Sequence, residues 1–374
     1  MKSTAAVLMG PLESGDFATE RPVRTAEIDV EAPTGTEVLI EIGAASLCHS
    51  DISMSRGHHD KQYPFVMGHE GAGYVQAVGD DVTTVEVGQQ VVLGRMSCGR
   101  CEYCRIGRSN LCERRVQARK AGTLRTGARR FRLDGSPIYH CHGVSSFSEY
   151  TIVTEEVAIP VTDEIPIRHA SLLGCGVFTG AGAVMNTADI EPGADIAIFG
   201  CGGVGLSAIQ AADVRGAGRV IAVDLVDEKL DLAADLGATH TVNSGVADPV
   251  EQIRDIVDDG VDYAFEIVGN VGVAEQAIES LAPLGTAVLV GAPPRGTKET
   301  ELNYFDVVLG ERSIVGSFNG SYDLPTAIPK LAEMVARGRF DLDPLISGER
   351  TLDEVNEALS ELDSGSGIRQ LIIP

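Results

Sequence analysis

The sequence lacks any long hydrophobic run. No stretch approaches the ~20 consecutive apolar residues that a membrane-spanning helix needs. The apolar run within Met1–Pro11 is too short for the hydrophobic part of a signal peptide. We therefore expect a cytoplasmic protein without a membrane partner. In that compartment the eight cysteines would be reduced and available as metal ligands or reactive thiols.

Positive charge is also scarce. The chain has 30 Lys and Arg residues against 54 Asp and Glu, which gives a formal net charge of −24. This balance disfavours nucleic acid or an anionic membrane as a partner. Adaptation to a salty interior is a second explanation of the acidity. With 374 residues, 44% of them hydrophobic, the chain is long enough for two domains.

Neither internal repeats nor low-complexity segments occur, and the texture of the chain changes once. The first 150 residues alternate short β-like runs with Gly, Pro and Asp, which predicts a compact β-rich domain. The runs are Glu37–Ile42, Gly73–Val78, Gln90–Leu93 and Ser148–Val153.

From about residue 178, apolar strands alternate with amphipathic helical patterns, which predicts an α/β domain with a doubly wound parallel sheet of about six strands. Two further helical patterns, Leu324–Arg337 and Leu352–Ser360, precede a final strand, Ile368–Ile373. The predicted strands are Asp195–Phe199, Arg219–Val223, Thr239–Val242, Val261–Ile267, Thr286–Val290 and Ser313–Phe318. The predicted helices are Val204–Arg215, Asp227–Leu236, Pro249–Val257 and Val273–Leu281.

A glycine fingerprint follows the first of these strands. Gly200-Cys201-Gly202-Gly203-Val204-Gly205 opens a predicted helix, and Asp224 ends the next predicted strand. This context predicts a dinucleotide site, because the glycines let the backbone approach a pyrophosphate at the helix N-terminus. Asp224 would bind the ribose hydroxyls and repel a 2′-phosphate, which favours NAD over NADP. A helix N-cap is the alternative role for Asp224.

Four cysteines form a compact motif: Cys98, Cys101, Cys104 and Cys112. The C-x2-C-x2-C-x7-C spacing allows four thiolates to surround one tetrahedral Zn²⁺ within a single loop. An iron–sulfur cluster is the chemical rival.

Another polar pair, His69-Glu70, lies among glycines and apolar residues in Tyr63–Gly73. Burying a carboxylate costs several kcal/mol unless a cation or metal is nearby. Taken alone, His69 could be a satisfied core histidine, and Cys48 and Cys175 could be small buried apolar residues.

These motifs together resemble the zinc-dependent medium-chain alcohol dehydrogenases. Cys48-His49-Ser50-Asp51, Gly68-His69-Glu70, the four-cysteine loop, Gly174-Cys175-Gly176 and the glycine fingerprint occur in the family's order and at about its spacing. The resemblance covers essentially the whole chain. It implies a GroES-like catalytic domain over 1–177 and 320–374, and an NAD-binding Rossmann domain over 178–319.

The resemblance also implies roles for the residues. Cys48, His69 and Cys175 would bind a catalytic zinc with one open position, and the four-cysteine loop a structural zinc. Hydride would pass to NAD from a zinc-bound alkoxide, and Ser50 would relay the proton. Many relatives have a histidine where this chain has Ser53, so the relay would end at His49 or at solvent. Asp51 would orient His69.

Further roles are implied for residues near the metal and the cofactor. Glu70 would lie behind the metal and approach it during ligand exchange. His49 and Arg369 would contact the pyrophosphate, Thr179 the nicotinamide side and Lys229 the adenosine ribose. A surface charge or a buried hydroxyl is the alternative for each of these four residues.

The substrate pocket departs from that of relatives that oxidise simple alcohols. The matching positions are Gly94, Cys141, His142 and Ala292, of which two are small and two can form hydrogen bonds. We expect a roomier and more polar pocket than an ethanol-type enzyme has. A loop alignment shifted by a residue or two is the alternative.

A basic segment is the second departure. Eight basic residues and no acid lie between Arg114 and Arg132: Arg114, Arg115, Arg119, Lys120, Arg125, Arg129, Arg130 and Arg132. This segment could recruit an anionic substrate such as a thiol–formaldehyde adduct. The alternative is a solvated loop that pairs with acidic surface.

We therefore predict an NAD- and zinc-dependent dehydrogenase that interconverts primary alcohols and aldehydes, with two zinc ions per chain. Oxidation of an S-hydroxymethyl thiol adduct and a non-catalytic NAD sensor are the alternatives. The long loop between Cys112 and Phe147 resembles that of dimeric relatives, so we expect a homodimer.

Overall fold

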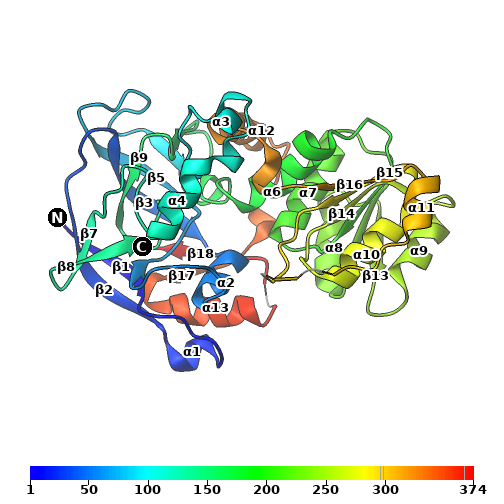
Figure 1. The fold of residues 1–374 in the computed structure, drawn as a ribbon, viewed down its shortest axis with the longest axis horizontal. Helices are drawn as coiled ribbons and strands as arrows, with labels where there is room; N and C mark the ends of the chain where they lie inside the picture. Colours follow the sequence, from blue (N-terminus) through cyan, green and yellow to red (C-terminus); the bar gives the residue numbers. More distant parts are fainter. Residues whose placement is uncertain (295, 298, 366) are drawn as a thin grey trace. The chain divides into compact units, whose positions relative to one another are not determined.

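The chain folds into two compact units in a computed structural model that describes residues 1–294, 296–297, 299–365 and 367–374. The first unit comprises Met1–Cys175, Tyr322–Gly338 and Leu342–Pro374, and the second comprises Gly176–Ser321 and Arg339–Asp341. Figure 1 shows the ribbon of both. None of the helices in the described part of the chain is long and apolar enough to cross a membrane.

A small closed barrel forms one side of the first unit. In β2, the buried residues Ala26, Ile28 and Val30 alternate with more exposed ones and belong to one core cluster. The strands follow the order β1 (Lys2–Leu8), β2 (Val23–Val30), β7 (Phe131–Leu133), β8 (Ser136–His140) and β4 (Phe65–Val66). Most of them are short, and only β2 shows a clear alternation in the sequence.

A seven-stranded sheet forms the rest of the β structure of this unit. Its longest strand, β3 (Glu37–Ser46), pairs with β5, β9 and β18. The other strands are β10 (Ala158–Pro160), β6 (Gln90–Leu93), β5 (Gly71–Val78), β9 (Tyr150–Thr154), β18 (Arg369–Ile373) and β17 (Ile346–Thr351). The C-terminal strand β18 thus joins a sheet built from the first 160 residues, which makes this unit discontinuous in sequence.

Helices also occur in the first unit, where the sequence predicted mainly strands. The basic segment Arg114–Arg132 was expected to be a loop, but it contains helix α4 (Glu113–Ala121) and strand β7. Helix α4 ends at Gly122, whose φ of 63° provides a left-handed C-cap. The other helices are α1 (Phe17–Glu20), α2 (His49–Ser55), α3 (Glu102–Arg105), α5 (Ile167–Ala170), α12 (Leu324–Ala336) and α13 (Val355–Asp363).

The second unit contains the predicted six-stranded parallel sheet, which confirms the Rossmann-type α/β fold. Its strand order is β13-β12-β11-β14-β15-β16, with parallel pairing throughout. The strands are β11 (Ile196–Phe199), β12 (Val220–Asp224), β13 (His240–Asn243), β14 (Val261–Glu266), β15 (Leu281–Leu289) and β16 (Ser313–Gly316). The order reverses between β11 and β14, the kind of position where open α/β sheets bind ligands.

Helices cover this sheet, as Figure 1 shows for α8 and α10. Helix α7 packs on β11 and β12, and α10 packs on β14 and β15. One core cluster of this unit contains Phe199 and Ile221 of the sheet, Ile253 of α9 and Ala277 of α10. The helices are α6 (Gly176–Gly182), α7 (Gly203–Val214), α8 (Asp227–Asp235), α9 (Pro249–Ile256), α10 (Val271–Glu279) and α11 (Tyr304–Leu309).

Two glycines explain why the turn from β11 into α7 needs this residue type. Gly200 has a φ of +100°, a conformation that side chains rarely adopt. A Cβ on Gly205 would lie 1.8 Å from the carbonyl oxygen of Gly200. The fingerprint glycines therefore allow the sharp turn and the close packing of helix on strand that a dinucleotide-binding loop requires.

Candidate active site

The first predicted ligand, Cys48, stands at the N-terminus of helix α2. Its backbone N–H donates to Asp51 Oδ2 at 3.0 Å, so the carboxylate closes the first turn of the helix. Cys48 is only 9% exposed. The local hydrogen bond fixes both the thiol and the Asp51 carboxylate on the same turn.

His69 lies between β4 and β5 and is buried. Its Nδ1 is 2.9 Å from Asp51 Oδ1, and its Nε2 is 3.7 Å from Cys175 Sγ. Cys175 is buried and directly precedes α6. The structure therefore brings Cys48, His69 and Cys175 together, with Asp51 on the opposite side of the imidazole.

The geometry of these three residues fits a tetrahedral metal. Their ligand atoms all lie within 4.8 Å of one another. Tetrahedral zinc with ordinary Zn–S and Zn–N bonds would separate sulfur from nitrogen by about 3.6 Å, close to the 3.7 Å found between Cys175 and His69. Two thiolates and one imidazole suit Zn²⁺ and leave a fourth position for another ligand.

Neighbouring groups shift the pKa values of His69 and Cys48. Burial alone would lower the pKa of His69, but the Asp51 carboxylate outweighs it and raises that pKa. The Cys175 thiol donates a hydrogen bond that lowers the pKa of Cys48 despite burial, with His69 and Arg369 adding to the shift. Zinc bound here would replace these shared protons.

Glu70 and Arg369 form a buried ion pair next to this group. Arg369 Nη1 lies 3.5 Å from Glu70 Oε2 and also donates to the carbonyl oxygen of Leu47 at 3.3 Å. Burial would lower the pKa of Arg369, but Glu70, Cys48 and Cys175 outweigh it and raise that pKa. Arg369 is 5% exposed. Its contact with a cofactor pyrophosphate stays a prediction.

Ser50 and His49 occupy the first turn of α2. The Ser50 hydroxyl lies 3.8 Å from Cys48 Sγ and is partly exposed. His49 is exposed. Ser50 is therefore next to the candidate metal ligands.

The four-cysteine loop forms a second candidate metal centre. Cys98, Cys101, Cys104 and Cys112 have their sulfur atoms within 4.8 Å of one another. The Cys101–Cys104 and Cys98–Cys104 distances are 3.4 and 4.0 Å, which bracket the ~3.8 Å edge of a tetrahedral zinc–thiolate site.

Backbone amides favour thiolate at one of these cysteines. The amide N–H of Cys101 donates to Cys98 Sγ at 3.3 Å. Partial burial opposes ionisation, but the amides of Arg100 and Cys101 lower the pKa of Cys98 to about 6. Burial and the neighbouring thiol of Cys101 raise the pKa of Cys104 to about 12. A bound cation would draw all four sulfurs into the thiolate form.

The candidate cofactor site lies in the second unit. Asp224, the last residue of β12, accepts from Cys201 N at 2.7 Å and from Leu225 N at 2.8 Å. The carboxylate therefore joins the glycine loop to the turn after β12. The N-cap of α8 is Val226, so the alternative role of Asp224 as a helix N-cap is wrong.

Two other predicted cofactor residues lie in the same unit. Thr179 is on α6, and its hydroxyl accepts a long hydrogen bond of 3.5 Å from Asn319. Lys229 is on α8. Their contacts with NAD stay predictions, as do those of Gly200, Gly202, Gly203, Val204 and Gly205.

Comparisons with known proteins agree with this arrangement. Residues 34–163 match the alcohol dehydrogenase GroES-like domain, and residues 203–335 match the zinc-binding dehydrogenase domain. The chain is 39% identical to S-(hydroxymethyl)glutathione dehydrogenase of Escherichia coli O139:H28, with all of both chains covered. It belongs to the zinc-dependent alcohol dehydrogenase family.

Solved structures give the same assignment. An alcohol dehydrogenase zinc-binding domain protein from Burkholderia ambifaria is similar with a TM-score of 0.94 and 37% identity, covering 100% of this chain and 99% of the other. Benzyl alcohol dehydrogenase from Acinetobacter calcoaceticus is similar with a TM-score of 0.92, 34% identity and the same coverage. The family consists of oxidoreductases, so the comparisons support an enzyme rather than a non-catalytic NAD sensor.

The predicted pocket residues of this dehydrogenase lie in different places. His142 is near the candidate metal site, with its ring centroid 5.6 Å from that of His69. Gly94 and Cys141 are buried, and Cys141 Sγ contacts Met54 Sδ at 3.7 Å. Ala292 is exposed in the second unit, after β15. The roomier and more polar pocket stays a prediction.

Much of the basic segment pairs with acids of the first unit. Arg125 contacts Glu156 at 2.7 Å, and Arg130 contacts both Glu31 at 3.0 Å and Glu37 at 2.8 Å. Arg132 also contacts Glu31, at 2.9 Å. For Arg125, Arg130 and Arg132, pairing with acidic surface is a better interpretation than recruitment of an anionic substrate.

Sequence reasoning missed one residue that touches a candidate ligand. Arg95 Nη2 lies 3.7 Å from Cys175 Sγ. Arg95 directly follows the predicted pocket residue Gly94 in the sequence. This adjacency is the one sequence feature that could have indicated that Arg95 lies near the site. Its cationic charge near the thiolate would reduce electron donation from sulfur to a bound metal.

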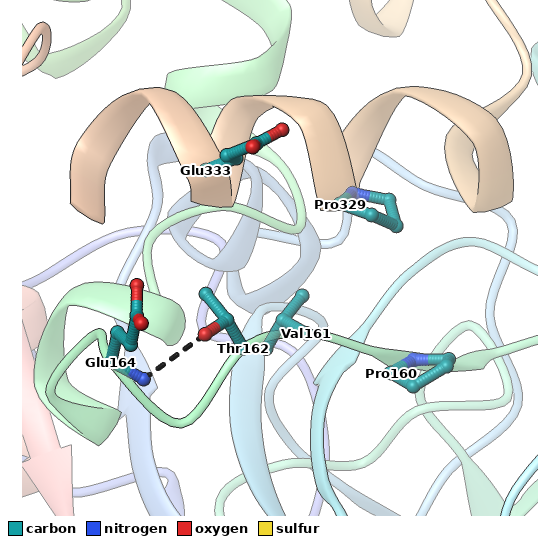
Figure 2. A pocket seen from close by; sticks show the side chains of 6 residues that line it. All are labelled: Pro160, Val161, Thr162, Glu164, Pro329 and Glu333. Atoms are coloured by element: carbon teal, nitrogen blue, oxygen red, sulfur yellow. Dashed lines mark hydrogen bonds between the residues drawn. The ribbon is translucent and has the colours of Figure 1, made fainter. Parts of the chain in front are cut away.

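A surface pocket lies between the end of β10 and helix α12. Figure 2 shows its six lining residues, with Glu164 N donating to Thr162 Oγ1 at 3.2 Å. The lining consists of Pro160, Val161, Thr162, Glu164, Pro329 and Glu333. It contains no predicted site residue, so we assign it no part in catalysis.

The Asp51–His69 contact leads to a prediction for this dehydrogenase. Asp51→Asn should lower zinc affinity at the Cys48, His69 and Cys175 group by about 10- to 100-fold, because the imidazole loses the carboxylate that orients it and makes its Nε2 a better electron donor. Competition with a chelator measures this affinity. Asp60→Asn, at an exposed acid nearby, is the matched control and should leave it unchanged. Equal zinc affinity in Asp51→Asn and wild type would contradict the role given to Asp51.

Proposed function

We propose that this chain interconverts primary alcohols and aldehydes, using NAD and a catalytic zinc held by Cys48, His69 and Cys175. The observation that carries the proposal is the convergence of these three ligand atoms within 4.8 Å, with Asp51 fixed behind the imidazole at 2.9 Å. Three protein ligands leave the open position that a catalytic zinc needs.

The chemistry divides between the metal and the protein. Zinc bound there would lower the pKa of an alcohol and polarise the carbonyl of an aldehyde. Asp51 holds the imidazole of His69 in one tautomer, so that Nε2 faces the metal position. Arg95 and Arg369 place positive charge near the ligand sulfurs, which would strengthen the metal's attraction for substrate oxygen.

Ser50 is the residue best placed to move the proton. Its hydroxyl lies on the same helical turn as Cys48, at 3.8 Å from the ligand sulfur, and it is partly exposed. We propose that Ser50 accepts the proton of the substrate hydroxyl and passes it on. Many relatives end this relay at a histidine, and this chain has Ser53 in that position. A serine cannot serve as that base, so the relay ends at His49 or at solvent.

The proposed cofactor is NAD, bound at the loop between β11 and α7. Asp224 Oδ1 accepts from the amides of Leu225 and Val226, whereas Oδ2 accepts only from the amide of Cys201. Oδ2 therefore has a further lone pair for a ribose hydroxyl. The negative charge would repel a 2′-phosphate. Lys229 would contact the ribose, Thr179 the nicotinamide side, and His49 and Arg369 the pyrophosphate.

A second zinc is proposed at Cys98, Cys101, Cys104 and Cys112. Four protein ligands leave no position for substrate, so this metal would be structural. Reduced thiols are needed at both zinc sites, and all eight cysteines are free of disulfides. We therefore also propose that the enzyme works in the cytoplasm.

Oxidation of an S-hydroxymethyl thiol adduct is the second candidate function. The observation that favours it is the 39% identity, over the whole chain, to a protein named S-(hydroxymethyl)glutathione dehydrogenase. Such a substrate also presents a primary hydroxyl. The same residues would therefore carry out the reaction, and only the recognition of the distant part would differ.

A homodimer is proposed from one edge of the second unit. Strand β16 lies at the end of the sheet, and its outer edge has no partner among the described strands. The neighbouring helix α11 exposes apolar side chains: Tyr304, Phe305, Val308 and Leu309. Such an edge is protected when two copies pair.

Sedimentation tests the homodimer. The wild-type protein should sediment with twice the chain mass of 39.4 kDa, and Leu309→Glu should sediment as a monomer. A monomeric wild type would contradict the proposal.

An activity screen tests the proposed function. Zinc-loaded protein is mixed with NAD or NADP and with aliphatic, aromatic or thiol-adduct alcohols, and formation of reduced cofactor is followed. We expect kcat/KM with NAD to exceed that with NADP by on the order of 100-fold, since contact between the Asp224 carboxylate and the 2′-phosphate of NADP costs several kcal/mol.

The same screen tests the substrate pocket. A preference for ethanol over larger or polar alcohols would contradict the predicted roomier and more polar pocket. No reduced cofactor with any alcohol would overturn the function.

A further inference from the structure

A buried carboxylate lies at the carboxyl end of β14, one of the two strands between which the sheet order reverses. Glu266 is the last residue of β14 and is only 2% exposed. In the part of the chain that the structure describes, no cation acts on its charge. Burying a carboxylate without a cation is costly, so its retention needs an explanation.

Backbone amides take the place of a cation. Glu266 Oε1 accepts from the amide of Gly269 at 2.6 Å and from that of Asn270 at 3.3 Å. Asn270 is the N-cap of α10, so the carboxylate ties the end of β14 to the start of the next helix. Burial raises the pKa of Glu266, although these amides oppose the shift. We call residues 267–270 the β14 turn, and its shape depends on this carboxylate.

A second segment, at the end of β15, packs closely on the β14 turn. The amides of Val290 and Gly291 donate to the carbonyl oxygen of Glu266, at 2.8 and 3.0 Å. A Cβ on Gly291 would lie 2.0 Å from the amide nitrogen of Gly269 and 2.7 Å from Glu266 Oε2. A Cβ on Gly269 would lie 3.0 Å from the backbone of Ala292. The two segments therefore enclose the carboxylate without room for a side chain between them.

The β14 turn also lies against the glycine loop between β11 and α7. A Cβ on Gly200 would lie 2.8 Å from Val268 Cγ2 and 3.6 Å from the amide nitrogen of Val268. The amide of Ile267 donates to the carbonyl oxygen of Phe199 at 3.0 Å. Because Phe199 directly precedes Gly200, the turn that Glu266 fixes is in contact with the first residue of the glycine fingerprint.

We infer that Glu266 is a positioning residue for NAD: its carboxylate holds the β14 turn against the glycine loop and so keeps that loop in the shape that receives the pyrophosphate. This inference rests on the proposed function, because the glycine loop is the proposed cofactor site. Glu266 acts through the backbone of the turn and not by contact with the cofactor. A loop that is already ordered binds more tightly, since the ligand does not have to order it.

Binding of the reduced cofactor tests the inference. Glu266→Leu removes the carboxylate and keeps a side chain of similar size. It should raise the dissociation constant of NADH by about 10- to 100-fold, because binding must then restore a turn whose buried amides have lost their acceptor. Glu266→Gln keeps one acceptor oxygen and should raise the constant much less. The fluorescence of NADH bound to zinc-loaded protein measures these constants.

Steady-state kinetics separates positioning from a general loss of activity. In Glu266→Leu, KM for NAD should rise with the dissociation constant, whereas KM for a primary alcohol should stay the same. The value of kcat should not fall, because weaker binding also speeds release of the reduced cofactor, a step that often limits turnover. A fall in kcat together with a higher KM for the alcohol would contradict a role confined to the cofactor.

Two matched variants separate positioning from stability. Glu279→Gln changes an exposed acid of α10 and should leave the dissociation constant of NADH unchanged. Ile253→Val lowers the stability of the same unit through its core and should also leave this constant unchanged. If Ile253→Val raised the constant as much as Glu266→Leu does, the effect would be one of stability alone and the inference would be wrong.

The remaining outcomes distinguish the inference from the proposed function. An unchanged dissociation constant in Glu266→Leu would overturn the inference and leave the proposed NAD site standing. If wild-type protein binds neither NADH nor NADPH, the proposed function itself fails. If Glu266→Leu does not fold, Glu266→Asp serves instead, because its carboxylate is one methylene too short to reach the same amides. An unchanged constant in Glu266→Asp would then overturn the inference.

Discussion

Replacing Cys175 with alanine is expected to remove one of the two proposed zinc ions and to lower kcat/KM for alcohols by on the order of 10⁴-fold. The remaining ligands, Cys48 and His69, hold a metal much more weakly than three ligands do. Without the metal, an alcohol keeps its ordinary high pKa and cannot release hydride at neutral pH. Metal analysis and the rate of NADH formation measure the two effects.

A matched variant shows whether the loss is specific. Cys201 is also buried, but it belongs to the glycine loop and is not part of either metal group. Cys201→Ala should therefore retain two zinc ions per chain. If Cys175→Ala also retained two zinc ions, or kept its activity, the assignment of Cys175 as a catalytic ligand would be wrong.

The second large effect concerns the four-cysteine loop. Cys101→Ser should lose the structural zinc and lower the free energy of unfolding by several kcal/mol, since such a metal contributes directly to folding. Part of the loop consists of short turns, including α3 (Glu102–Arg105), and has few apolar contacts to hold it without metal. Zinc content and the melting temperature measure the outcome.

In Cys101→Ser, we expect the four-cysteine loop to open before the rest of the chain unfolds. Hydrogen exchange should increase in residues 98–121 of Cys101→Ser before the Rossmann sheet is affected, because local units can open separately. Tyr103→Phe changes an exposed side chain of the same loop and should retain the zinc and the melting temperature. A stable Cys101→Ser variant with unchanged exchange would exclude a structural metal at this loop.

The second unit was predictable from sequence because its buried parallel strands are apolar runs that alternate with helices. Val220–Asp224, for example, is a continuous apolar strand that ends in the acid of the cofactor motif. The glycine fingerprint indicated a strand before it and a helix after it. The hydrophobic pattern and the glycine motif therefore both predicted an α/β domain, and the structure confirms its six-stranded parallel sheet.

The first unit was harder to predict. Strands such as β4 (Phe65–Val66) and β7 (Phe131–Leu133) are too short to show a period, and their pairing is set by distant partners. Helix α4 buries only Ala118 within its nine residues, so it has almost no apolar stripe. A polar, basic run of this kind resembles a loop in sequence, and tertiary context decides that it is helical.

The candidate metal site was found through spacing and resemblance, since Cys48, His69 and Cys175 are far apart in the sequence. The resemblance also predicted Asp51 beside His69, but no pattern predicted that Arg95 would lie beside Cys175. Glu266 gave no signal either, because it falls inside the predicted strand Val261–Ile267. Its burial between two turns follows from long-range packing, which the sequence alone does not reveal.

Zinc titration with an activity readout tests the central claim most directly. Mild chelation is used to prepare protein with one zinc per chain, and zinc is then added back while NAD reduction by a primary alcohol is measured. The rate should rise in proportion to the second equivalent of zinc and level off at two per chain, the number of ligand groups in the structure. Full activity at one zinc per chain, or a rate that does not depend on zinc, would contradict the account.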